Sequence, residues 1–124
     1  EEARVCYING QFLATMLCAT SAVEHLLVAE LEERINLSGK LTFGPLIEQA
    51  DATSLSPPEV IERLKVLNER RNPVAHRRSP EDNSTLASRY LQKKVHPNVL
   101  LEADAKLSLE VMYEVFLLLL KRCA

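Results

Sequence analysis

Apolar residues recur every three or four positions along most of the chain, which is the spacing of one face of an α-helix. The first such segment runs from about residue 3 to residue 37, and it carries no charge between Phe12 and Val23. A helix that is apolar on all sides is buried on most of them. Gly39 supplies a stop signal. The positions that define the apolar stripe are Val5, Ile8, Phe12, Met16, Ala19, Val23 and Leu27.

Two helices are expected next, and both are marked by capping residues. The first is short, with Thr42 as its N-cap and Pro45 in its first turn. The second has Ser56 as N-cap, Pro57 at its first helical position and Glu59 where a capping box needs a carboxylate.

A short polar helix is expected over roughly residues 84 to 94, and the last helix from about residue 101 to residue 122. No segment shows the alternation of a strand. The sequence therefore predicts an all-α bundle of four main helices plus one short helix, forming a single domain over residues 1–124. Because the chain begins with Glu-Glu, we expect it to be a processed chain or part of a longer one, and it shows no signal peptide.

Composition narrows the class of protein. The net charge is −2, from 15 basic and 17 acidic residues, whereas a general nucleic-acid binder is more basic, so any RNA contact must come from a local patch. The three cysteines, Cys6, Cys18 and Cys123, are odd in number and form no CxxC pair, which indicates reduced thiols in a cytoplasmic protein. No membrane association is expected, because Glu110 and Glu114 interrupt the most apolar segment.

Several chemistries have no sequence support. The chain contains no phosphate-cradling glycine loop and no metal-ligand spacing of Cys or His, so we expect no cofactor and no metal. Of the three histidines, His25 falls within the long first helix, as a surface or a partly buried and hydrogen-bonded residue, and His96 falls in a loop.

The stretch "ERRNPVAHRR", residues 69–78, holds the candidate chemistry. Pro73 cannot donate to the carbonyl of Glu69, so the helix either kinks there or ends, with Asn72 capping a new turn. Arg71 continues an apolar stripe and must point toward an interior or an interface, where a guanidinium needs a partner. A plain proline kink with a solvated basic rim is the alternative interpretation. The stripe that Arg71 continues is formed by Val60, Leu64 and Leu67.

The motif R-N-x-x-x-H, closing an amphipathic helix in a small all-α chain, resembles the HEPN family of helical domains, which occur in many prokaryotic defence and toxin ribonucleases. The resemblance extends from "SAVEHLL" through "RNPVAH" to "LLEADAKLSLEVMYEVFLLLL", and only the six-residue motif is specific. It implies a helical bundle that forms a homodimer and cleaves RNA without a metal. It also implies a possible cognate antitoxin or fused effector domain as partner.

Carried over to this sequence, the resemblance makes Arg71 and His76 catalytic, with Asn72 supporting the site. The chemistry is consistent, because a histidine with a pKa near ~6.5 can serve as acid or base and an arginine offers a fork of donors to phosphate. Arg78 stands where some family members carry a tyrosine that a partner nucleotidyltransferase modifies, which puts that kind of partner in doubt. Other members of the family are non-catalytic nucleotide-binding or dimerisation modules, and this alternative stays open.

Further charged residues extend the candidate site. Arg70, Arg77 and Arg78 flank the motif and would contact RNA if they converge with the basic residues of the following helix; otherwise they form a solvated face. Glu24 interrupts the apolar first helix, either as the buried partner that Arg71 needs or as the start of a polar face. The basic residues of the following helix are Arg89, Lys93 and Lys94.

Overall fold

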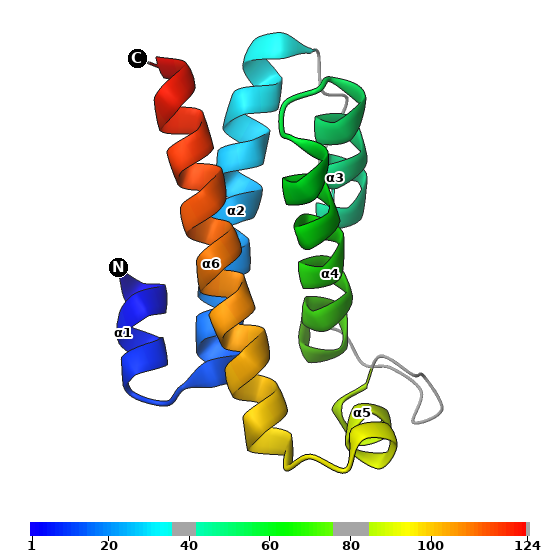
Figure 1. The fold of residues 1–124 in the computed structure, drawn as a ribbon. Helices are drawn as coiled ribbons and strands as arrows, with labels where there is room; N and C mark the ends of the chain where they lie inside the picture. The colour runs from blue at the N-terminus through cyan, green and yellow to red at the C-terminus, as the bar shows by residue number, and fades with distance from the viewer. Residues whose placement is uncertain (36–41, 76–84, 124) are drawn as a thin grey trace.

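The computed structural model describes residues 1–35, 42–75 and 85–123, and within these residues all regular structure is helical. The predicted all-α class is therefore confirmed. The described residues form six helices rather than the expected five (Figure 1). The helices are α1 (Glu2–Ile8), α2 (Phe12–Arg34), α3 (Phe43–Ala52), α4 (Pro58–Ala75), α5 (Leu86–Lys93) and α6 (Pro97–Cys123).

The two longest helices, α2 and α6, lie side by side and run in the same direction (Figure 1). The third long helix, α4, packs against both and runs in the opposite direction, so its C-terminal end faces the beginning of α6. α3 packs against α2 and α4, whereas α1 covers α2 and α6 near their N-terminal halves. The short helix α5 lies at the lower end of the bundle and contacts α6.

One hydrophobic core joins α2, α3, α4 and α6. Each helix contributes apolar side chains at three- or four-residue spacing, and removing such a side chain from water contributes roughly 1.5–3 kcal/mol. This shared core holds α4 against the two central helices. Its largest fully buried members include Leu27, Leu31, Phe43, Leu46, Leu64, Leu67 and Val111.

The expectation of one continuous helix from residue 3 is wrong, because the chain breaks between α1 and α2. Gly10 takes a left-handed conformation, with φ of +75°, and ends the first helix after Ile8. The break turns α1 back against α2, where Tyr7 and Phe12 bring their ring centres to 5.7 Å. Val5 and Ile8 consequently lie exposed, although the later stripe positions from Met16 to Leu27 are buried as predicted.

The expected charge-free region of α2 is also less buried than its composition indicates. Leu13 and Leu17 lie on an exposed face, while the buried face packs against neighbouring helices. By length and composition α2 would suffice to cross a membrane, a property that core helices of soluble proteins and signal sequences share.

α3 starts where the sequence predicts, whereas the starts of α4, α5 and α6 differ from the prediction by one to four residues. Thr42 is the N-cap of α3, although its side chain makes no capping bond. α4 starts at Pro58 rather than Pro57, whose carbonyl accepts the first helical hydrogen bonds. α6 starts four residues early at Pro97, because His96 caps it: its Nδ1 accepts from the amide of Asn98 at 3.1 Å.

Candidate functional site

Arg71 continues the buried stripe of α4, as its register predicts. Leu64 and Leu67 are fully buried, Val60 packs on the core, and the side chain of Arg71 is only 21% exposed. The side chain of Arg71 therefore lies at the edge of the core, where α4 faces α2.

Glu24 on α2 is the partner of Arg71 in the structure. The Oε1 atom of Glu24 lies 3.2 Å from Nη2 of Arg71, and both side chains are largely shielded from water. The Nε atom of Arg71 is buried and has no hydrogen-bond partner among the described residues. Because Nε is buried, the terminal nitrogens are the donors that the exposed 21% of the side chain can offer to a further oxygen ligand.

Pro73 lies inside α4, which continues to Ala75. The alternative in which the helix ends and Asn72 caps a new turn is therefore wrong, because α4 continues through Pro73. Because Pro73 has no N–H, the carbonyl of Glu69 loses its usual helical donor. The side chain of Asn72 is half-buried beside Arg71 and makes no hydrogen bond to another residue that the structure describes.

His76, Arg77 and Arg78 lie outside the described residues, so their roles stay predictions. The motif is consequently described on one side only, by Arg71 and Asn72 at the end of α4.

Asp104 on α6 forms a second charged cluster close to the motif. It is buried, with 5% of its surface exposed, and binds both terminal nitrogens of Arg89 on α5 at 2.5 and 3.0 Å. The Nε atom of Arg70 lies 3.9 Å from the same carboxylate. A bidentate guanidinium–carboxylate pair of this kind is among the strongest polar contacts in proteins.

The expected basic groove is therefore smaller than the sequence indicates. Arg89 is not available to phosphate, because Asp104 occupies its terminal nitrogens and its side chain is buried. Lys93 and Lys94 are exposed at the end of α5, where Lys94 takes a left-handed conformation that ends the helix. Of the described arginines at the motif, Arg70 and Arg71 are the ones partly open to solvent.

The charges of the two clusters do not cancel. Three arginines, Arg70, Arg71 and Arg89, face two carboxylates, Glu24 and Asp104, which leaves one positive charge among these five side chains. An excess positive charge in a partly dry setting favours an anionic ligand.

Sequence reasoning missed Asp104, although one signal was visible. Asp104 shares the register of buried positions in α6, together with Leu100, Ser108 and Val111. A carboxylate at a core-facing position requires a cationic partner. The partner Arg89 belongs to another helix, and no local spacing identifies it.

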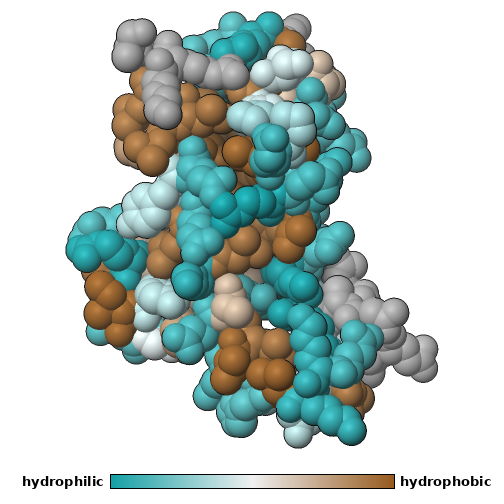
Figure 2. Space-filling model, viewed as in Figure 1, coloured by the Kyte–Doolittle hydropathy of each residue, from teal (hydrophilic) through white to brown (hydrophobic). Residues whose placement is uncertain are grey.

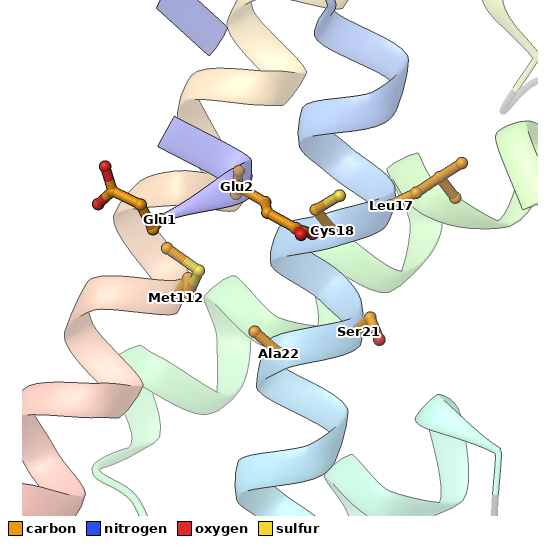
Figure 3. Close-up of a pocket in the computed structure, with 8 residues that line it drawn as sticks. Glu1, Glu2, Leu17, Cys18, Ser21, Ala22 and Met112 are labelled. Carbon is orange, nitrogen blue, oxygen red and sulfur yellow. The ribbon is translucent and has the colours of Figure 1, made fainter. Parts of the chain in front are cut away.

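A separate hollow of about 530 Å³ opens between α1, α2 and α6 (Figure 3). Cys18 and Met112 form part of its wall, the side chain of Glu2 extends toward Cys18, and the carboxylate of Glu1 points away. Burial raises the pKa of the Cys18 thiol, and Cys6 and Glu2 add to the effect. A raised thiol pKa keeps Cys18 protonated and poorly nucleophilic near neutral pH. Neither Arg71 nor Asn72, the motif residues that the structure describes, lines this hollow.

Among the described residues, no three side chains of His, Cys, Asp or Glu gather in a way that would hold a metal ion. The polar atoms that do converge on the motif are arginine nitrogens and carboxylate oxygens. A scan against protein-family models found no match for the chain, and searches of the curated proteins and of the solved structures found none either.

Proposed function

We propose that this chain is a metal-independent endoribonuclease of the HEPN type that acts as a homodimer. The observation that carries the proposal is the setting of Arg71: it is half-buried, one of its terminal nitrogens is paired with Glu24, and 21% of its side chain stays exposed. A guanidinium in this state is suited to a phosphate oxygen. The proposed role is RNA cleavage in cytoplasmic defence or as a toxin, with a cognate antitoxin or a fused effector domain as partner.

The reaction uses the nucleophile that RNA carries. A base removes the proton of a ribose 2′-hydroxyl, and the 2′-oxygen forms a bond to the adjacent phosphorus while the bond from phosphorus to the 5′-oxygen breaks. An acid protonates the departing 5′-oxygen, which leaves a 2′,3′-cyclic phosphate and a 5′-hydroxyl. His76 serves as one of these groups and the partner's His76 as the other, since each chain carries one motif histidine.

Arg71 stabilises the negative charge that builds on the phosphate oxygens during this reaction. Glu24 fixes the guanidinium from the side of α2, which reduces the ordering that substrate binding would otherwise require. Asn72 supports the site as the next residue of the motif. The excess of one positive charge in the two clusters adds to phosphate affinity.

The test is cleavage of single-stranded RNA by the purified protein in EDTA, with analysis of the product ends. A 2′,3′-cyclic phosphate is expected, because the 2′-oxygen is the attacking group. A requirement for added magnesium or manganese, or a product with a 3′-hydroxyl, contradicts the mechanism. A catalytically dead Arg71→Ala protein purified in parallel controls for contaminating ribonuclease.

A second candidate function is a non-catalytic HEPN-type nucleotide-binding or dimerisation module of a larger protein. A row of exposed apolar side chains along the C-terminal half of α6 favours it (Figure 2). The row consists of Tyr113, Phe116, Leu117 and Leu120. A dimer that forms through this row and leaves RNA intact under all conditions supports the module over the enzyme.

A further inference from the structure

Asp104 is a single buried carboxylate that contacts arginines from two different helices. Its oxygens bind Nη1 and Nη2 of Arg89 at 2.5 and 3.0 Å, and Oδ1 also lies 3.9 Å from Nε of Arg70. One residue of α6 therefore links the motif end of α4 to α5.

The contact with Arg70 leaves that arginine partly free. It is made through Nε, and the side chain remains 28% exposed. The two terminal nitrogens are thus left for another acceptor, since no described residue other than Asp104 pairs with Arg70. At 3.9 Å, Asp104 attracts the inner end of the guanidinium as an ion-pair partner without a hydrogen bond, and it does not use up the outer end.

Consecutive residues on a helix point about 100° apart, so Arg70 and Arg71 leave α4 in different directions. Arg71 reaches Glu24 on α2, and Arg70 reaches Asp104 on α6. The two central helices each supply one carboxylate that orients one arginine at the motif end of α4.

The carboxylate of Asp104 also attaches α5 to α6. Arg89 is the buried residue of α5, whereas Tyr90 and Leu91 are exposed. At the N-cap of α5, Thr85 accepts from the amide of Ser88, and within the helix Arg89 binds Asp104 of α6.

We propose that Asp104 is a positioning residue, which presents Arg70 to RNA as a second phosphate-binding arginine beside Arg71 and anchors α5 to the motif end of α4. The inference about Arg70 rests on the proposed ribonuclease function; the anchoring of α5 does not. The ligand of Arg70 is a phosphate of the RNA backbone.

Hydrogen exchange tests the anchor without RNA. In Asp104→Asn, the amides of α5 should exchange at least tenfold faster than in the wild type, while the core amides of Ile61 to Leu67 keep their protection. The matched control is Arg63→Gln, which breaks two other pairs between α4 and α6, with Glu110 at 2.8 Å and with Glu114. Unchanged exchange of α5 in Asp104→Asn overturns the anchor.

A double variant tests the positioning of Arg70. Asp104→Leu with Arg89→Met removes both buried charges together, a replacement that is often tolerated and leaves net charge unchanged. The probe is a single-stranded RNA that a 2′-deoxy nucleotide at the scissile link makes non-cleavable. We expect the fold to persist and the affinity for this RNA to fall about tenfold. The salt slope of binding should fall by about 0.7, the value of one lost phosphate contact. A purely structural role would leave that slope unchanged.

Arg70→Gln completes the cycle. It should cause the same loss in the wild type and no further loss in the double variant, because Asp104 acts through Arg70. If the losses of RNA affinity from Arg70→Gln and from the double variant add up while the wild-type protein cleaves RNA, Asp104 does not act through Arg70. That result overturns the positioning role of Asp104 and leaves the proposed function standing. If the wild-type protein neither binds nor cleaves RNA, the proposed function and the role of Arg70 are both overturned. The hydrogen exchange of α5 in Asp104→Asn then still decides whether Asp104 anchors that helix.

Discussion

Arg71 on α4 and Glu24 on α2 face each other across the helix interface, with 3.2 Å between Nη2 and Oε1. The arginine belongs to the motif, and the carboxylate interrupts an otherwise apolar stretch of the first long helix. Both side chains are about a quarter exposed or less. Water screens such a pair less than a surface pair, so each partner depends on the other for its place in the structure.

Glu24→Gln should lower the free energy of unfolding by about 1 kcal/mol, since it keeps the shape of the side chain and removes its charge beside Arg71. Urea unfolding measures the change. The control is Glu62→Gln, whose pair with Lys65 at 3.5 Å is mostly exposed and should contribute little. Equal effects of the two substitutions would show that the Glu24 pair has no special weight.

His76→Ala should reduce RNA cleavage at least ~100-fold, the loss typical of a general acid or base, while the fold and the dimer persist. Arg71→Lys should also be poorly active, because an ammonium group cannot make a two-pronged contact with phosphate. Cleavage rates and circular dichroism of the same preparations decide the outcome. Unfolding of His76→Ala, instead of loss of activity, would make this cluster structural.

Pro73→Ala asks whether the proline in α4 matters for activity. It restores an N–H opposite the carbonyl of Glu69 and should stabilise the helix. We expect cleavage to fall, because the proline sets the direction of the last helical turn. Full activity of a more stable protein would show that the proline is incidental.

The helices were predictable because core positions repeat with the period of a helix. Met16, Ala19 and Val23 are buried where the pattern places them. The break at Gly10 was missed because the apolar spacing continues through it, and periodicity alone does not register a single left-handed residue.

The candidate site was predictable in part. The register of α4 indicates that Arg71 needs a partner, and Glu24 is visible as a charge in an apolar run. The pair between Arg89 and Asp104 could not be predicted, because it depends on how α5 packs on α6, which no local pattern encodes. Arg89 therefore joins neither of the two expected surfaces, a basic groove or a solvated charged face, because it is buried against Asp104.

Self-association should depend on the exposed row of α6, because exposed apolar patches of this kind mark interaction surfaces (Figure 2). We expect a dimer for the wild type and a monomer for Leu117→Glu by light scattering at micromolar concentration. Leu91→Glu is the control, since Leu91 is more exposed, at 72%, but lies on α5 away from the row. A wild-type protein that stays monomeric across a tenfold dilution series refutes the dimer.

Gly10→Ala should destabilise the chain by about 1 kcal/mol through backbone conformation alone. An added Cβ at Gly10 would meet no atom within 4 Å, so no clash contributes. The φ of +75° is nevertheless costly for a residue with a side chain, by roughly 1–2 kcal/mol, and a smaller unfolded-state entropy offsets part of this.

Gly44→Ala is the matched control, because Gly44 lies in the first turn of α3, where the new Cβ would make an ordinary contact of 3.6 Å with Asn68. Alanine is the better helix former, so this variant should equal or exceed the wild type in stability. Urea unfolding of both variants separates the two effects. If Gly10→Ala is as stable as the wild type, the turn between α1 and α2 tolerates another conformation. If it is destabilised, faster hydrogen exchange in α1 should accompany the loss, because the turn is what returns Ala3 to its contact with Ala19 and Leu109.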